Sequence, residues 1–215
     1  MNKWVTGLTT ALFGWTLCLS QAMASTQADE AGAMVQSVSE KVVAELNQNR
    51  TRYEGNPQAV KAFAEEYVLP YVDTFRMARY VMGRYWKLAS ETQQEAFAEA
   101  FKTMLLRSYS KSLLKLEIDS VKVTRITEER PGRASIQSEV LQADGNASRV
   151  DYRAYYSDTK QRWLLYDMTV EGVSLLLNYR KTYGSEFASK GVARVINELE
   201  SKNQEALAEQ SEAAA

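Results

Sequence analysis

The sequence contains no histidine. Without imidazole, neither a Ser-His-Asp nor a Cys-His nucleophile system can be built, and zinc cannot be held through histidine nitrogen. Carboxylate pairs, Ser-Lys dyads and tyrosine acids remain available, so this absence disfavours enzyme function without forbidding it. Phosphate-binding glycine loops, metal-spaced carboxylate clusters and nucleophile elbows are also missing from the sequence.

Cysteine is nearly absent, and its one example lies in a segment that has the features of an export signal. Lys3 precedes an apolar run from Trp4 to Leu19, and Ala22-Met23-Ala24 then supplies a small-x-small cleavage pattern. This order is typical of a secretory signal peptide, and an uncleaved anchor is the alternative. We therefore expect residues 1–24 to be removed and the protein to be exported to a compartment that permits disulfides, yet without forming one, so that its fold rests on an apolar core.

A strong charge of either sign and a second long apolar run are also missing. Removing Lys3 with the signal leaves 26 − 1 = 25 basic residues against 27 acidic ones, a net charge of −2. This near-neutral balance argues against nucleic-acid binding, and no other run is long enough to span a bilayer. We expect a soluble protein with one domain over residues 25–203 and a disordered tail over residues 204–215, where large apolar groups are few.

The first half of the chain has the apolar spacing of amphipathic helices. Apolar side chains recur at intervals of three and four within residues 34–46, 60–68, 75–82 and 97–113. Helix starts are indicated by Asn56-Pro57, by Asp73 and by the capping-box pattern of Ser90 and Gln93. Residues 25–32 are expected to form only a frayed start.

After about residue 116 the apolar period changes to two. Alternation within residues 121–123, 134–141, 149–156 and 162–170, with a turn signal at Asp144-Gly145-Asn146, predicts an antiparallel meander of about four strands. Helical spacing returns from Ser174 to Leu199. Helices segregated before and after an antiparallel sheet make the expected fold class α+β.

Several segments resemble the MlaC family, also called the toluene-tolerance auxiliary component of ABC transport. They are Leu69-Pro70-Tyr71-Val72-Asp73, residues 80–86, residues 97–101, and the strand end Tyr166-Asp167-Met168 with residues 171–174 after it. The resemblance covers about residues 30–200. It implies an NTF2-like-related fold in which helices cover a curved sheet and acyl chains are buried between them.

The same resemblance implies a function. Members of this family are periplasmic phospholipid carriers that maintain outer-membrane lipid asymmetry. The implied partners are phospholipid, an inner-membrane ABC transporter bearing an MCE-domain ring, and an outer-membrane lipoprotein–porin complex. We expect a monomer with no cofactor, no metal and no catalytic residue. The residues expected to line the lipid slot are Tyr71, Phe75, Met82, Phe101, Leu105, Tyr109, Val140, Tyr152 and Val170.

Two other functions stay open at this point. A small-molecule enzyme on an NTF2-like cone would need a buried acid facing the cavity, and Asp167 is the first candidate because it lies four residues from Glu171. Capping of the helix near Ser174 is the structural alternative for Asp167. A periplasmic adaptor or chaperone would instead have a solid core and an exposed apolar groove.

Overall fold

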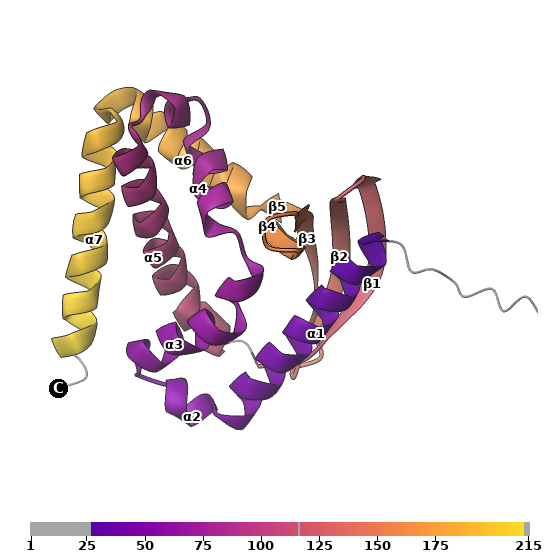
Figure 1. The fold of residues 1–215 in the computed structure, drawn as a ribbon. Helices are drawn as coiled ribbons and strands as arrows, with labels where there is room; N and C mark the ends of the chain where they lie inside the picture. The colour runs from indigo at the N-terminus through magenta and orange to yellow at the C-terminus, as the bar shows by residue number, and fades with distance from the viewer. Residues whose placement is uncertain (1–26, 116, 213–215) are drawn as a thin grey trace, which may run out of the picture.

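The structure is a computed structural model that describes residues 27–115 and 117–212. The expected signal peptide lies outside these residues. Helices α1–α5 come first, a five-stranded sheet follows, and α6 and α7 end the chain (Figure 1). This order confirms the α+β prediction. The element bounds are α1 Gln27–Gln48, α2 Arg50–Tyr53, α3 Pro57–Tyr67, η1 Leu69–Tyr71, α4 Thr74–Met82, η2 Gly83–Leu88, α5 Glu91–Lys115, β1 Ile118–Arg130, β2 Arg133–Gln142, β3 Ala147–Ser157, β4 Arg162–Val170, β5 Val173–Ser174, α6 Leu175–Lys190 and α7 Val192–Glu212.

The predicted helix starts are confirmed by their hydrogen bonds. The backbone N–H of Ala59 donates to Asn56 Oδ1 at 3.0 Å, and Pro57 is the first residue of α3. Before α5, the N–H of Gln93 donates to Ser90 Oγ at 3.2 Å, while the N–H of Ser90 donates to Gln93 Oε1 at 3.1 Å. Each cap satisfies amide groups that the first helical turn leaves without partners.

The sheet is an antiparallel meander in which the strands lie in chain order. Its turn between β2 and β3 is the predicted one, with Gly145 at φ +84° and the N–H of Asn146 donating to Asp144 Oδ1 at 2.9 Å. The prediction of about four strands omitted β5, which pairs only Val173 and Ser174 with the end of β4. A strand of two residues is too short to produce an alternating pattern.

Residues 25–32 were expected to be only a frayed start, but helix α1 already begins at Gln27. Ala28 and Ala31 are buried against the sheet, and a Cβ added to Gly32 would lie 2.1 Å from Ile126 Cδ1. Small side chains therefore allow the first turns of α1 to pack closely on β1 and β2. The prediction failed because alanine and glycine contribute little to a count of large apolar residues.

Helix α7 runs to Glu212, so the expected disordered tail is wrong for residues 204–212. The segment is rich in glutamate, glutamine and alanine, which favour helix even where nothing is buried. A shortage of large apolar groups predicts that a segment does not pack, and it does not predict that the segment lacks helical structure. Val195, Ile196 and Leu199 secure the helix nearer its start, where they are buried.

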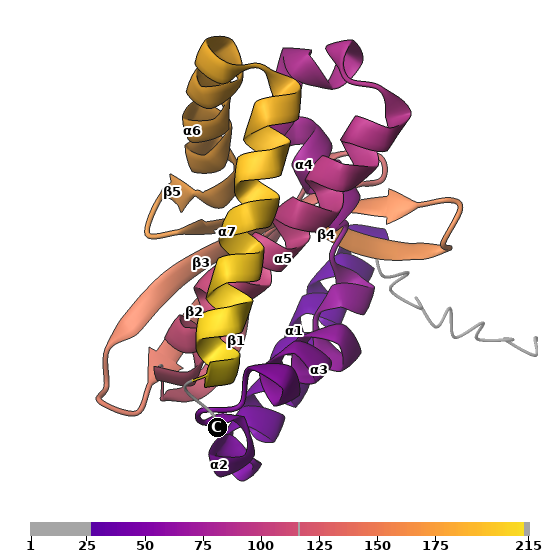
Figure 2. The same cartoon turned by 90° about the vertical axis from the view of Figure 1, so that its left-hand side faces the viewer.

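The two faces of the sheet are covered by different helices. Helix α1 crosses one face, while α4 and α6 pack against β4 from the other and α5 and α7 complete a helical layer (Figures 1 and 2). Val72, between η1 and α4, forms a parallel bridge to Leu165 of β4. Helix α3 packs against both α1 and α5. None of the described helices is long and apolar enough to cross a membrane.

Candidate functional site

Among the residues whose side chains the structure describes, the buried apolar side chains fall into three clusters. One joins α4–α7 to β4, a second joins α1 to the sheet, and a third joins α1 to α2 and α3. A compact domain of this size ordinarily has one contiguous core with small satellites. Further apolar side chains of α1, of β4 and of the end of α3 are only partly covered, and they include Val38, Val42, Tyr67, Val68, Leu165 and Met168. We define the candidate site, called the junction, by these partly covered side chains.

Tyr152 marks the sheet side of this junction. It lies between Ile136 on β2 and Met168 on β4, on the face that α1 covers. Burial raises the pKa of Tyr152, and hydrogen bonds with Ser138 and Ser39 lower it by less. The side chain nevertheless keeps part of its accessible surface. A side chain surrounded by protein and still accessible is what the lining of an internal space requires.

Val140 and Val170 lie on the same face as Tyr152. Val140 is one alternation beyond Ser138 on β2, and Val170 pairs with Val150 at the end of β4. Val140 is half-buried and Val170 is 41% exposed. The structure thus brings these three predicted residues together on one sheet face.

Three of the predicted residues lie on α5. Phe101 is fully buried and its ring meets that of Tyr179 edge-on at 5.3 Å. Leu105 and Tyr109 follow toward the end of α5 that approaches α3. The Tyr109 hydroxyl lies 3.4 Å from that of Tyr179, and burial together with this hydrogen bond raises the pKa of Tyr109 although its side chain is 40% exposed.

Three predicted residues lie elsewhere. Met82 is fully buried in the helical core, behind the α5 residues. Phe75 is 48% exposed and packs edge-on against Trp86, with ring centroids 5.1 Å apart. Tyr71 lies in η1 and lines a cavity beside α1.

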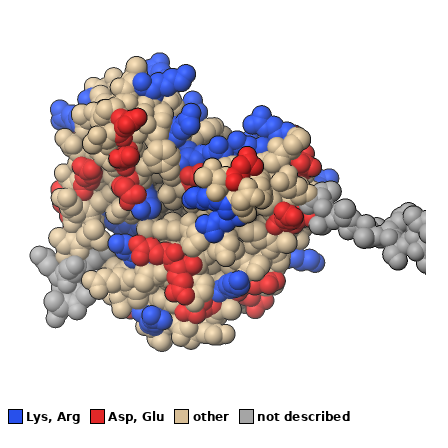
Figure 3. Space-filling model, viewed as in Figure 1, with Lys and Arg blue, Asp and Glu red and all other residues tan. Residues whose placement is uncertain are grey.

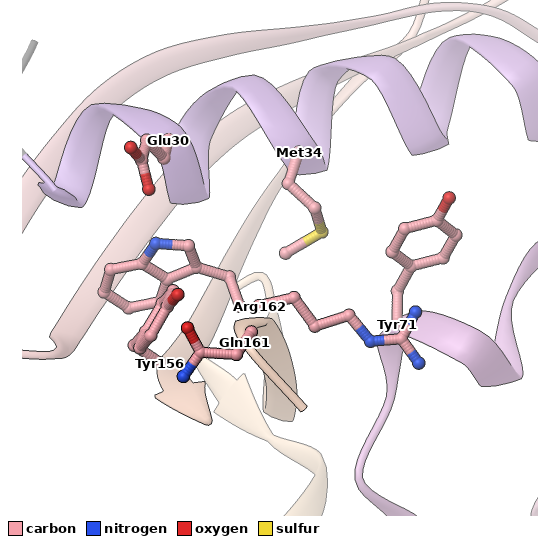
Figure 4. A pocket seen from close by; sticks show the side chains of 7 residues that line it. Glu30, Met34, Tyr71, Tyr156, Gln161 and Arg162 are labelled. Atoms are coloured by element: carbon pink, nitrogen blue, oxygen red, sulfur yellow. The ribbon is translucent and has the colours of Figure 1, made fainter. Parts of the chain in front are cut away.

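The cavity at Tyr71 has a volume of about 250 Å³ and is half open. Figure 4 shows Glu30 and Met34 reaching down from α1, the Arg162 side chain extending toward Tyr71, and Tyr156 with Gln161 at the opposite end. The seven side chains that line it are Glu30, Met34, Tyr71, Tyr156, Gln161, Arg162 and Trp163. Six of these were not predicted. In the sequence, only the aromatic content of residues 155–166 pointed to two of them, Tyr156 and Trp163.

Asp167 has the structural role that was the alternative to catalysis. It is buried, and its carboxylate accepts hydrogen bonds from Ser174 Oγ at 2.9 and 3.2 Å and from the N–H of Leu176 at 3.2 Å. Ser174 in turn caps α6 by accepting from the N–H of Leu177. The carboxylate therefore holds the start of α6 against β4. Among the described residues, no cluster of acidic side chains could hold a metal ion.

Many basic side chains form cation–π contacts with aromatic rings or ion pairs with acidic side chains. The Arg76 guanidinium lies 3.7 Å from the centroid of Tyr155, whose hydroxyl donates to Asp73. Arg153 pairs with Glu129 at 3.5 Å. Figure 3 shows Lys and Arg side chains gathered between the helical layer and the sheet, with acidic side chains among them. This arrangement joins the two layers.

Comparisons with known proteins point in one direction. Residues 36–201 match the family model described as MlaC protein. The chain is 24% identical over 202 residues to the intermembrane phospholipid transport system binding protein MlaC of Haemophilus influenzae, covering 93% of this chain and 92% of that protein. It is 23% identical over 159 residues to the toluene tolerance protein ttg2D of Pseudomonas putida, covering 74% of this chain and 73% of that one.

A solved structure shares the fold. The phospholipid-binding protein of Ralstonia solanacearum, determined in complex with a phospholipid, superposes with a TM-score of 0.75 at 24% identity. The match covers 82% of this chain and 98% of that chain. Because the family model spans most of the chain and the fold agrees, the chain belongs to the MlaC family.

Proposed function

We propose that the chain is a periplasmic phospholipid carrier and that it is not an enzyme. The acyl chains of the bound lipid would occupy the junction between the three core clusters. The divided core is the observation that carries this proposal, because the described apolar side chains of α4–α7 with β4, of α1 with the sheet, and of α1 with α2 and α3 form three clusters and not one. The names of the relatives and the phospholipid in the Ralstonia solanacearum structure support the ligand class.

The energetics of transport favour a site of this kind. Burial of an acyl chain contributes about 0.8 kcal/mol per CH₂, so two chains of about 15 methylenes each amount to about 24 kcal/mol of transfer from water. Free diffusion of a lipid across an aqueous gap is therefore too rare to be useful. A carrier must come close to the membrane in affinity without greatly exceeding it, because otherwise it would not release its lipid.

The proposed lining follows from the placement of the predicted residues. Tyr152, Val140 and Val170 would form the sheet wall, and Leu105 and Tyr109 the helical wall. Phe101 and Met82 would support the helical wall from behind, since both are fully buried. The hydroxyl group of Tyr152, flanked by Ser138 and Ser39, would be a polar point in an otherwise apolar wall.

The proposal includes the location of the carrier and the partners with which it would exchange lipid. A cleaved signal peptide over residues 1–24 would place the carrier in the periplasm. There it would exchange lipid with an inner-membrane ABC transporter bearing an MCE-domain ring and with an outer-membrane lipoprotein–porin complex. The relative in Haemophilus influenzae supports this proposal, because its name places it in an intermembrane phospholipid transport system.

Native mass spectrometry of protein purified from periplasm without detergent tests the function. We expect about one phospholipid per chain, lost on denaturation. The variant Val140→Trp would fill the sheet side of the junction and is expected to lower the bound fraction severalfold. Leu88→Trp, at a side chain that is 74% exposed in η2, is the matched control. A bare wild-type chain that stays bare after incubation with phospholipid vesicles would refute the carrier and favour the adaptor.

A further inference from the structure

Exposed apolar side chains gather where β4 turns into β5 and α6 begins. Val170 is 41% exposed, Val173 is 65% exposed and Leu177 is 58% exposed. The other large apolar side chains that are exposed in the described part of the chain are spread singly over α4, η2, α5 and α7. Single exposed apolar side chains are ordinary, whereas a group of them marks contact with an apolar ligand or surface. We call Val170 and Val173 the apolar lip.

The lip continues a row of side chains that comes from the protein interior. Val150 on β3 pairs with Val170 on β4, and Val170 pairs with Val173 on β5. Directly paired residues of antiparallel strands carry their side chains on the same face of the sheet. Val150 is only 7% exposed, so the exposed fraction rises from 7% to 41% and then to 65% across the three strands. The row therefore joins the interior to the solvent through valine alone.

This row lies beside Tyr152, which marks the sheet wall of the proposed lipid site. Tyr152 follows Val150 by two residues on β3, and its partner Met168 precedes Val170 by two residues on β4. Side chains two positions apart on a strand share a face and lie about 7 Å apart along it. The register shift between β3 and β4 lies beyond Tyr152, so it does not interrupt this alternation. The lip is therefore the place where the apolar wall of the site reaches the solvent.

Helix α1 leaves this end of the sheet face open. It packs mainly on β1 and much less on β2 and β4. Figure 2 shows β5 at the edge of the sheet beside α6 and away from α1. The exposure of the lip thus follows from the path of α1, which covers the opposite edge of the sheet.

The lip is held in place by the turn between its two valines. Glu171 and Gly172 both have positive φ, +49° and +81°, as a tight two-residue hairpin turn requires. The Glu171 carboxylate accepts from the N–H of Arg149 at 2.6 Å, and the Glu171 N–H donates to the carbonyl of Arg149 at 3.0 Å. These bonds tie the turn to β3, so the exposed valines are presented on a fixed hairpin.

We propose that the apolar lip is the portal through which the acyl chains of a phospholipid enter and leave the protein. This inference rests on the proposed carrier function and adds a route to it. Each methylene that passes into water raises the barrier to transfer, so apolar cover that extends to the protein surface speeds exchange. Val170 and Val173 provide such cover between buried Val150 and the solvent.

Chemical blocking of the lip tests the route. The one cysteine of the sequence, Cys18, lies in the expected signal peptide, so Val173→Cys places a single thiol in the exported chain. This thiol is labelled with a bulky maleimide, and exchange of a fluorescent phosphatidylethanolamine with vesicles is followed by dequenching. Labelling should slow uptake and release at least about fourfold, the factor for one methylene that loses its apolar cover. Chains loaded before labelling should retain their lipid, as native mass spectrometry can show.

The matched control is Leu88→Cys with the same label, because Leu88 is 74% exposed and lies in η2. It should exchange lipid at the wild-type rate. Unlabelled Val173→Cys should do so too, which shows that the substitution itself leaves the fold intact. Val173→Asp should slow exchange without any label, whereas Val173→Leu should keep the wild-type rate.

The outcomes separate the portal from the carrier function. If labelled Val173→Cys exchanges lipid as fast as labelled Leu88→Cys, the portal is refuted while the carrier function stands. If the wild type takes up no lipid at all, the carrier function and the portal fail together. A native mass spectrum with a dimer that the label at position 173 dissociates would also overturn the portal, because the lip would then be a contact between two copies of the chain.

Discussion

The side chain of Gln36 is hydrogen-bonded to the backbone of Val123 on the outer strand of the sheet. The N–H of Val123 donates to Gln36 Oε1 at 2.8 Å, and Gln36 Nε2 donates to the carbonyl of Val121 at 2.9 Å. One amide thus occupies a donor and an acceptor of β1 that have no neighbouring strand. Unpaired strand edges are templates for association with other chains, so α1 protects the sheet as well as covering it.

Replacing Gln36 with alanine should therefore weaken both folding and solubility. We expect the free energy of unfolding to fall by about 1–3 kcal/mol, because a partly buried donor and acceptor lose their partners. Urea unfolding measures the change, and light scattering during refolding measures association. Gln58→Ala, at an exposed position of α3, is the control and should change neither. An unchanged stability in Gln36→Ala would mean that water replaces the amide without loss.

Tyr155 gives the protein a sensitivity to alkali. Burial and the hydrogen bond to Asp73 raise the pKa of Tyr155 to about 12. The folded state therefore binds this proton more tightly than the unfolded chain, whose tyrosine pKa is near 10. The stability that Tyr155 contributes is complete below about pH 10 and is lost as the pH rises toward about 12.

Tyr155→Phe separates this contribution from other alkaline effects. The variant should be less stable than wild type near neutral pH, because Asp73 loses a donor, and the two stabilities should converge above about pH 10. Unfolding experiments across this range test the convergence. Tyr156→Phe, on the opposite face of β3, removes a hydroxyl that does not bond to Asp73 and serves as the control near neutral pH. Parallel curves for wild type and Tyr155→Phe would contradict the assignment.

Asp167 distinguishes a structural acid from a catalytic one. Asp167→Asn keeps the shape of the side chain but weakens the hydrogen bonds from Ser174 and Leu176, so we expect a loss of about 1–3 kcal/mol in the free energy of unfolding. Lipid bound per folded molecule should stay at the wild-type value. Asp119→Asn, exposed on β1, is the control for removal of a charge. Wild-type stability with altered ligand chemistry would instead support the enzyme alternative.

The parts of the fold that could be predicted are those set by local physics. Asn56 and Ser90 indicate helix starts because their side chains bond to amides three residues along the chain. Alternation in β2 predicts a strand because successive side chains point to opposite faces. Membership of the family likewise followed from short segments such as residues 69–73 and 80–86, whose order and spacing are visible without a structure.

The lining of the site could not be predicted so directly. Phe101 and Tyr109 belong to one apolar stripe of α5, yet the first is fully buried and the second is 40% exposed. Helical spacing identifies the stripe, but the packing of α3, α6 and α7 decides which part of it is covered. Glu30 and Arg162 are separated by 132 positions, and only the tertiary fold places them at one cavity.

Asn203 of α7 has a hydrogen-bond partner for one of its two polar side-chain atoms and none among the described residues for the other. Its Nδ2 donates to the carbonyl of Ala100 at 2.8 Å, while Oδ1 is buried without a partner among the described residues. Asn203→Leu removes both atoms and keeps most of the volume, so its stability should equal or exceed that of wild type, since Ala100 retains the bonding of its helix. Asn203→Ala leaves a cavity and should be less stable than wild type by about 1–2 kcal/mol. Thermal unfolding of wild type and the two variants checks the order, and a leucine variant less stable than wild type would show that the side-chain amide is required between α5 and α7.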